Sequence, residues 1–264
     1  MKGGFATRLK RTNCSMLLTL SVVVEGMSGF AQDLPAGAGE NRGLSYGLEA
    51  DFNSGYVWRG IAFSNEPTMQ PSVWVERSGL TFTVWRNVVL GQGPDVADLR
   101  ETDLSLTYSR HWKRLTIEPA LDAYLPRPSP GVHDPNTMEG SLKLSHPAGP
   151  LSIFTTHSFD VLAYRGAYFG EAGMSYDRHV NKKFGLNLSL RSGWASSKFN
   201  DAYIGLDKPA FDFVGAEVSL TYYLKSKVYI QPHIEFSDIV DHRLRPLLPW
   251  PTFVNFGLAM GVGF

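Results

Sequence analysis

A strict two-residue alternation in the last stretch of the chain, TFVNFGLAMGVGF from Thr252 to Phe264, is the feature that most constrains the fold. Large apolar residues occupy every second position from Val254 onwards, and Asn255, glycine or alanine fills the positions between them. Side chains of a β-strand point alternately to opposite faces, so this pattern predicts a strand with one apolar and one small or polar face. A soluble core and lipid both suit the apolar face, and the rest of the chain decides between them.

The same alternation recurs upstream. It begins at Leu44, where apolar residues alternate with small or acidic ones, and it is clearest from Phe184 to Arg191. The pattern predicts about twelve strands, an even number of the kind that single-chain bacterial outer-membrane barrels have. We expect them near residues 44–53, 67–77, 79–89, 100–110, 114–125, 136–146, 150–158, 167–177, 183–194, 210–224, 227–237 and 253–264.

The connections between these strands alternate in length. Short turns are expected at 78–79, 111–112, 147–149, 178–181 and 225–227, and long loops at 57–66, 90–99, 126–135, 159–166, 195–209 and 238–252. Outer-membrane barrels place short turns in the periplasm and long loops outside, whereas Greek-key sandwiches have no reason to alternate in this way. The sequence therefore predicts an all-β fold, a transmembrane antiparallel up-and-down barrel with both termini in the periplasm.

The N-terminal region has the composition of an export signal. Basic residues precede an apolar run from Met16 to Val24, which is shorter than the about 20 residues that a spanning helix needs. We expect residues 1–31 to be a signal peptide cleaved after Ala31, residues 32–43 a flexible lead, and residues 44–264 the barrel. The only cysteine, Cys14, would leave with the signal, so the mature chain would hold no thiolate metal site or cysteine nucleophile.

Charge is low and balanced, with 25 basic and 25 acidic residues and 19% charged residues in total. The absence of a net field removes the usual electrostatic reason to expect nucleic acid as a partner. No metal-ligand spacing, phosphate-binding glycine motif or nucleophile elbow appears, so we expect no metal, no cofactor and no enzyme.

Two histidines, His157 and His233, are candidates for a lipid-modifying active site. His157 and Ser158 are adjacent and therefore point to opposite faces of their strand. His233, Glu235 and Ser237 share a face, yet neighbours two positions apart in a strand are separated by about 7 Å, beyond hydrogen-bond reach. A lipid-modifying enzyme is therefore the less favoured alternative.

The polar faces of the strands are expected to line the interior. Charge on the lipid face costs about 2 to 4 kcal/mol for Arg or Lys at mid-bilayer, which favours inward placement. Carboxylates outnumber basic groups on these faces, so we expect a hydrated lumen that prefers cations. The predicted pore-lining residues are Glu49, Asp51, Arg86, Asp103, Glu118, Asp122, Glu139, Lys143, Glu171, Arg191, Glu217, His233 and Glu235.

Aromatic residues gather where strands meet loops, a placement typical of interfacial girdles. We expect an outer girdle of Tyr56, Trp58, Trp85, Tyr124, Trp194 and Phe211, and an inner one of Tyr108, Trp112, Tyr176 and Tyr222. The loop from Asp238 to Thr252 is too apolar for an exposed loop, and it either folds inward as a constriction or packs against lipopolysaccharide or a partner. Gly257, Gly261 and Gly263 are expected to widen the lumen.

The segment from Asp51 to Asn87 is similar to the opening hairpins of the TorF-like putative porin family of Gram-negative bacteria. The matching elements are GYVWRGI at Gly55–Ile61, QPSV at Gln70–Val73 and SGL at Ser78–Leu80, and the proline-rich loop 126–135 departs from the family. The resemblance implies an outer-membrane barrel with a channel role and no defined solute. We expect the channel to pass small hydrophilic solutes by passive diffusion. The alternative is a closed structural or adhesive barrel.

The last residue adds a second resemblance. Phe264 resembles the terminal Phe of outer-membrane barrels, which the barrel-assembly machinery reads in that family. The expected surroundings are therefore the outer membrane of a Gram-negative bacterium, with its lipid and lipopolysaccharide as further partners.

Overall fold

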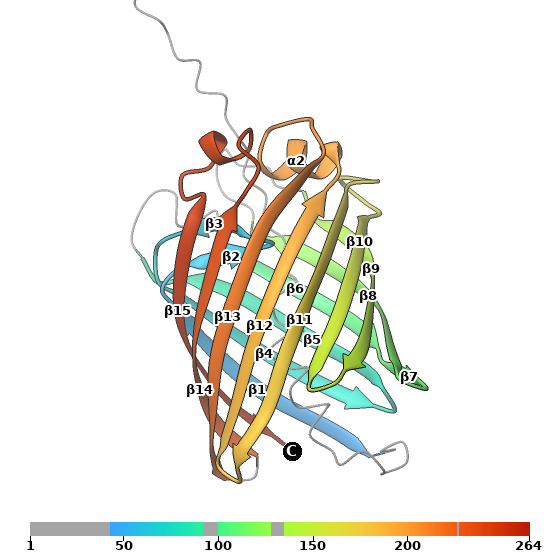
Figure 1. The fold of residues 1–264 in the computed structure, drawn as a ribbon, viewed down its shortest axis with the longest axis vertical. Coiled ribbons are helices and arrows are strands. Elements are labelled where there is room, and N and C mark those ends of the chain that lie inside the picture. The colour runs from blue at the N-terminus through green and yellow to red at the C-terminus, as the bar shows by residue number, and fades with distance from the viewer. Residues whose placement is uncertain (1–42, 92–99, 128–134, 226) are drawn as a thin grey trace, which may run out of the picture.

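The computed structural model describes residues 43–91, 100–127, 135–225 and 227–264 (Figure 1). The predicted signal peptide, residues 1–31, and all but the last residue of the predicted lead lie outside the described residues. No helix among the described residues is long and apolar enough to cross a membrane.

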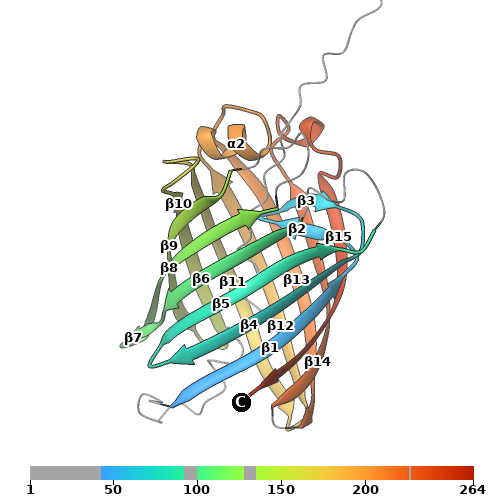
Figure 2. The ribbon, with the colours of Figure 1, turned by 180° about the vertical axis from the view of Figure 1, so that it is seen from behind.

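Twelve long antiparallel strands of the described chain form a closed barrel (Figures 1 and 2). The first strand pairs with the last, and β6 pairs with β8, so no edge is left open. The wall strands are β1 (Leu44–Asn53), β4 (Thr68–Arg77), β5 (Leu80–Val89), β6 (Glu101–Tyr108), β8 (Leu115–Pro126), β9 (Thr137–Ala148), β10 (Leu151–Asp160), β11 (Tyr168–Asn181), β12 (Phe184–Ala195), β13 (Ala210–Lys225), β14 (Val228–Ile239) and β15 (Thr252–Gly263).

The predicted fold class is confirmed, and each predicted strand lies within a few residues of its observed bounds. The short connections lie at one end of the barrel together with the C-terminus, and we call this the inner end (Figure 1). The long connections lie at the opposite, outer end, where α2 (Ser197–Tyr203) is found. A short strand, β7 (Arg110–Trp112), extends the inner end beside β8.

The outward face of the wall is apolar all the way round. Each of the twelve wall strands carries an exposed large apolar side chain, for example Leu44, Val73, Leu80, Leu106, Leu121, Met138, Ile153, Met174, Leu188, Val218, Ile234 and Val254. A continuous apolar surface of this kind is stable against lipid and not against water. The two-residue alternation of each strand therefore places its apolar face towards the lipid and its polar face towards the lumen.

The inner aromatic girdle lies where it was expected, with Tyr108 and Trp112 exposed on the outward side. Trp194 and Phe211 are outward at the outer end. The prediction is wrong for the other four outer residues, Tyr56, Trp58, Trp85 and Tyr124, whose side chains are at most 3% exposed inside the barrel. Position at a strand end does not tell the two faces apart. Within the lumen Tyr56 packs on Trp85, Trp58 belongs to the same buried cluster, and the Tyr124 hydroxyl donates to Glu139.

The closing strand β15 confirms the alternation that was predicted for it. The Phe264 N–H donates to the Tyr46 carbonyl at 2.8 Å, and the two rings stack with centroids 5.1 Å apart. The expectation that glycines widen the lumen is wrong at two positions. The space beside Gly257 holds the His233 ring, and the space beside Gly261 holds the Tyr229 ring.

Candidate functional site

A short hairpin between β1 and β4 folds into the barrel and occupies the outer half of the lumen. It consists of β2 (Tyr56–Trp58) and β3 (Ile61–Ser64), and every residue from Gly55 to Ser64 is buried. We call residues 55–64 the plug hairpin. The prediction of an external loop over 57–66 is therefore wrong for most of that segment, because its apolar side chains are covered by the barrel wall rather than by solvent.

The turn of the plug hairpin is built from Arg59 and Gly60. Both have positive φ, 47° and 81°, and Trp58 pairs with Ile61 across them. These features identify a two-residue turn of the primed type, which matches the twist of paired strands. A side chain at Gly60 would overlap the Phe213 ring, and the Ser237 hydroxyl donates to the Gly60 carbonyl at 2.7 Å. The tip is therefore held against β13 and β14.

Arg59 ties the same tip to the opposite wall. Its guanidinium donates to both carboxylate oxygens of Glu139 on β9, at 3.0 and 2.5 Å, and the Tyr124 hydroxyl donates to the same carboxylate at 3.1 Å. The guanidinium carbon also lies 4.3 Å from the centre of the Trp58 ring and 4.6 Å from that of Phe169. A buried charge requires such pairing, so this contact fixes the hairpin across the lumen.

The base of the plug hairpin is anchored to the closing strand. The Asn255 side-chain oxygen accepts hydrogen bonds from the Ser54 hydroxyl at 3.0 Å and from the Gly55 N–H at 3.1 Å. The Thr68 hydroxyl donates to the Gly55 carbonyl at 3.2 Å. The hairpin is thus joined covalently to the wall only at its base, and its tip is held by non-covalent contacts of side chains and of the Gly60 carbonyl.

Aromatic side chains surround the hairpin and fill the outer half of the lumen. Trp58 packs on Phe199 and Tyr203 of α2, with ring centroids 5.6 and 5.1 Å away. Tyr56 packs on Trp85 of β5, and Phe169 and Phe213 join from β11 and β13. The external loop that carries α2 therefore helps to cover a core that has no counterpart in the predicted hydrated lumen.

The loop between β14 and β15 contributes to the same core. Leu244 is fully buried and Leu248 is 9% exposed against the aromatic cluster, whereas Leu247 between them is 48% exposed. The inward alternative predicted for this loop therefore holds for two of its three leucines. A short helical turn, η2 (Arg245–Leu247), shapes it, and hydrogen bonds from Arg243 lower the pKa of Asp241 to about 2.

A layer of carboxylates lies beside the plug hairpin on β6, β8 and β9. Glu101 accepts a long hydrogen bond from the Tyr56 hydroxyl at 3.5 Å, and Asp122 accepts one from the Ser105 hydroxyl at 2.6 Å. Asp103 is 3% exposed between them, and Glu139 completes the layer beneath Arg59. Sequence reasoning found three of these four groups and missed both Glu101 and the arginine that faces them.

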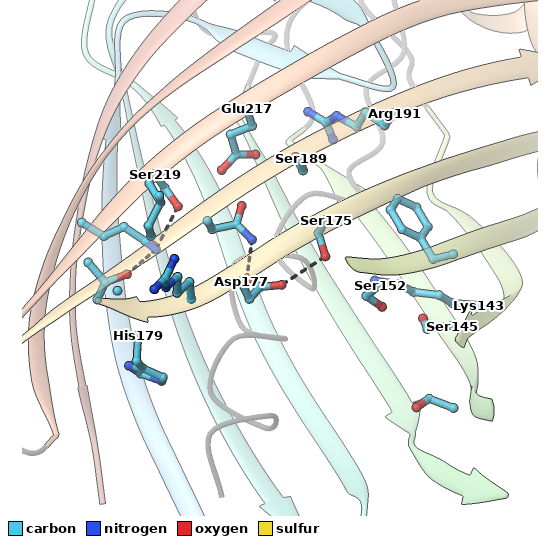
Figure 3. Close-up of a pocket in the computed structure, with 18 of the residues that line it drawn as sticks. Lys143, Ser145, Ser152, Ser175, Asp177, His179, Ser189, Arg191, Glu217 and Ser219 are labelled. Atoms are coloured by element: carbon cyan, nitrogen blue, oxygen red, sulfur yellow. Dashed lines mark hydrogen bonds between the residues drawn. The ribbon is translucent and has the colours of Figure 1, made fainter. Parts of the chain in front are cut away.

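The inner half of the lumen holds a polar cavity of about 370 Å³, which we call the vestibule (Figure 3). Hydroxyl groups dominate its wall, and a hydrogen bond of 3.1 Å from Ser175 to Asp177 belongs to it. Its inward carboxylates outnumber its inward basic groups. The carboxylates are Glu118, Asp177 and Glu217, and the basic side chains are Lys143 and Arg191, with His111 and His179 near the inner turns. Arg178 borders the cavity, but it is adjacent to the inward Asp177 and therefore faces outward, where it donates to the Tyr176 hydroxyl at 3.4 Å.

The structure places twelve of the thirteen predicted site residues on the inward face. Four of them line the vestibule, namely Glu118, Lys143, Arg191 and Glu217. The other eight lie nearer the wall or the plug hairpin, where most have a partner, and they are Glu49, Asp51, Asp103, Asp122, Glu139, Glu171, His233 and Glu235.

Arg86 is the exception, and its predicted inward placement is wrong. It is exposed, whereas its neighbours Trp85 and Asn87 are buried, so it shares the outward face with Val84 and Phe82. The cost of an outward arginine falls to about 0 to 1 kcal/mol near the membrane interface. Arg86 lies close to the outer end of β5, where its long side chain reaches polar surroundings.

The residues weighed for catalysis have separate partners. His233 hydrogen-bonds Asn53 at 3.1 Å, Glu235 forms an ion pair with Arg191, and Ser237 donates to Gly60. His157 contacts the Tyr168 hydroxyl at 2.9 Å on the outward face, and Ser158 is buried on the inward face. The opposite orientation predicted for the adjacent His157 and Ser158 is confirmed.

Comparison with known proteins supports the fold. The chain is similar to the NanC porin, with 13% identity over 83% of this chain and 98% of that one, at a TM-score of 0.50. It is also similar to an outer-membrane channel from Pseudomonas putida F1, with 11% identity over 84% and 96% at a TM-score of 0.47. The translocator domain of the autotransporter NalP from Neisseria meningitidis matches with 8% identity over 92% and 94%, also at 0.47.

Neither a family model nor a curated protein sequence matches the chain. The likeness to the NanC porin therefore shows the fold of an outer-membrane β-barrel, and the function has to be argued from the lumen.

Proposed function

We propose that the chain is a porin-like channel of a Gram-negative outer membrane, which passes small hydrophilic solutes and is closed at its outer end by the plug hairpin. The observation that carries the proposal is the division of the lumen. The vestibule is an open polar cavity of about 370 Å³, and the segment that blocks the way beyond it is a discrete hairpin anchored at its base. A gate of this kind differs from a lumen packed shut by the wall itself.

The strand number supports this reading. Barrels of eight strands have interiors just wide enough to be filled by their own side chains, and sixteen or more strands leave a channel. In this twelve-strand barrel the outer half is filled largely by residues that do not belong to the wall, among them Trp58, Phe63, Phe199 and Leu244. Withdrawal of the plug hairpin would remove Tyr56, Trp58, Ile61 and Phe63 from this filling and open a way from the vestibule towards the outer loops.

The resemblance to the TorF-like putative porin family fits this proposal. The longest of its matching elements, Gly55–Ile61, contains the first strand and the turn of the plug hairpin. The proposal assigns no catalytic chemistry to the chain, and the surrounding partners are lipid, lipopolysaccharide and, through Phe264, the barrel-assembly machinery.

Cation preference belongs to the same proposal. We assign it to the carboxylate layer beside the plug hairpin and less to vestibule residues such as Glu118. Nine predicted carboxylates face inward, against the basic groups Arg59, Lys143 and Arg191, and Arg86 no longer counts among the latter. The vestibule has three inward carboxylates against Lys143 and Arg191, whereas the layer that contains Asp103 and Asp122 has four against Arg59 alone, so the excess is larger in that layer. Confined carboxylates raise the local concentration of cations. We therefore expect selectivity to depend on this layer more than on Glu118.

A reversal-potential measurement in a potassium chloride gradient tests the function. The purified protein in a planar bilayer should conduct with a preference for potassium over chloride, and Asp122→Asn should reduce that preference more than the matched vestibule change Glu118→Gln. A channel that prefers chloride would contradict the cation assignment. A barrel that assembles and never conducts, with or without its plug hairpin, would favour the closed structural or adhesive alternative.

A further inference from the structure

One arginine lies at the outer end of each of the neighbouring strands β5, β6 and β8. Asn87, Glu101 and Pro126 form one row across these strands, and Glu101 in that row is 2% exposed and faces inward. Adjacent residues of a strand face the opposite way, so the neighbours of this row face outward. These neighbours are Arg86, Arg100 and Arg127, which we call the rim arginines.

The rim arginines are close together. The Arg127 N–H donates to the Arg100 carbonyl at 2.8 Å, so the ladder between β6 and β8 continues through this pair. Residues directly opposite in such a ladder have Cβ atoms about 5 Å apart. Arg86 pairs with Thr102, which makes it the diagonal neighbour of Arg100 at about 7 to 8 Å. Three long guanidinium side chains can therefore converge on one group.

This cluster has no counter-charge among the residues that the structure describes. None of the rim arginines takes part in an ion pair there, and the Arg100 Nε is shielded from solvent without a hydrogen-bond partner. Like charges directly opposite in a sheet are destabilising, so an anion between them would relieve the repulsion. The arginine fork matches the geometry of phosphate and binds it in two-point contacts.

The surroundings of the cluster indicate a lipid as the source of the phosphate. On the outward face below the rim arginines lie apolar side chains such as Val84 and Leu104. On β10 to β13, further round the outer end, the outward positions carry aromatic rings instead, including Phe159, Trp194 and Phe211. The β5–β8 side, in contrast, joins a positive rim to an acyl-binding surface.

We propose that the rim arginines bind the phosphate groups of a lipid A type headgroup in the outer leaflet, with the acyl chains lying on the apolar wall below. This inference rests on the outer-membrane location in the proposed function. It adds a lipid site on the outside of the barrel, which is separate from the lumen and from conduction.

Lipid A binding in detergent micelles tests the site. The variant Arg86→Gln, Arg100→Gln, Arg127→Gln should bind lipid A at least about tenfold more weakly than wild type by native mass spectrometry, because charge-assisted contacts are lost. The matched control is Arg77→Gln, Arg110→Gln, Arg114→Gln, which removes the same charge from exposed positions at the inner end and should bind like wild type. Lysine at the three rim positions should restore part of the affinity.

Further arms separate the possible outcomes. Heat-modifiable migration in gels checks that each variant is folded, and the single change Arg86→Gln provides a milder variant should the triple fail. Phosphatidylcholine should not replace lipid A, and inorganic phosphate alone should not raise the unfolding temperature as lipid A does. Equal affinity in the rim triple, an equal loss in the inner-end control, or full stabilisation by inorganic phosphate would overturn the proposal. Conductance of the rim triple should stay as in wild type, so failure here leaves the channel proposal standing.

Discussion

Arg59 and Glu139 form a two-point ion pair inside the lumen, at 3.0 and 2.5 Å, although they are 80 residues apart in the chain. Their side chains are 3% and 2% exposed. Removal of one partner from a buried pair leaves an uncompensated charge and costs about 3 to 5 kcal/mol. The pair joins the tip of the plug hairpin to β9. We therefore expect its loss to displace the hairpin while the barrel wall stays folded.

The change Glu139→Gln should therefore loosen the plug hairpin. A cysteine introduced at Ala62, which is 1% exposed, should react slowly with a polar maleimide in the parent protein and several-fold faster when Glu139→Gln is added. The matched control is Glu76→Gln, a carboxylate near the inner end that accepts from Ser45 at 2.9 Å. Equal labelling in the Glu139→Gln variant and its parent would contradict the role of the ion pair.

Gly60→Ala should disturb the same segment for a different reason. The position has a φ of 81°, and an added Cβ would overlap the Phe213 ring. Overpacking of this kind costs about 1 to 3 kcal/mol, and a positive φ adds to it. We expect a lower unfolding temperature by heat-modifiable gel migration, whereas Gly263→Ala, which has nothing within 4 Å of an added Cβ, should behave like wild type.

Tryptophan fluorescence should separate the two faces of the barrel. Trp112 is 61% exposed on the outward side, whereas Trp58 is fully buried beside the plug hairpin. Brominated lipids quench rings that touch acyl chains, so Trp112→Phe should reduce the quenchable fraction and Trp58→Phe should not. The reverse result would mean that the plug hairpin lies outside the barrel.

The sidedness of the barrel can be tested in intact cells. A cysteine at Asp201, which is exposed on α2 at the outer end, should react with an impermeant reagent before lysis. A cysteine at Lys182, in the short turn between β11 and β12, should react only after lysis. Labelling of Lys182→Cys in intact cells and of Asp201→Cys only after lysis would invert the proposed topology.

The wall of this barrel could be read from the sequence because lipid imposes a simple rule. Each strand must place apolar side chains outward at every second position, and each connection must alternate in length, so strand number and order followed from local patterns. The inward prediction for Arg86 is wrong because it followed from the charge of the residue and not from its place in the alternation. Arg86 lies two positions from Val84 and four from Phe82, so it shares their outward face. Its distance from the bilayer midplane keeps the free-energy cost of an outward arginine low.

The plug hairpin was missed because its partners are distant in the chain. The segment from Tyr56 to Ser64 has the pattern of a loop between two strands. No local pattern in the sequence indicates that it contacts Glu139, Phe213 and Ser237. One local signal was present, since a run with five large apolar residues around an Arg-Gly turn is too apolar for an exposed loop. The same argument marks the loop 238–252 as too apolar to be exposed; it leaves inward folding and packing against lipopolysaccharide or a partner as alternatives, and the structure buries Leu244.

Single-channel conductance with and without the plug hairpin tests the account most directly. A variant in which residues 56–64 are replaced by a short Gly-Ser linker should fold as a barrel, since β1 and β4 pair with each other over their full length. We expect wild type to conduct rarely or with small steps and the variant to conduct steadily through a lumen that now runs from the vestibule to the outer loops. A correctly assembled variant that conducts no more than wild type would contradict the role of the hairpin as the gate.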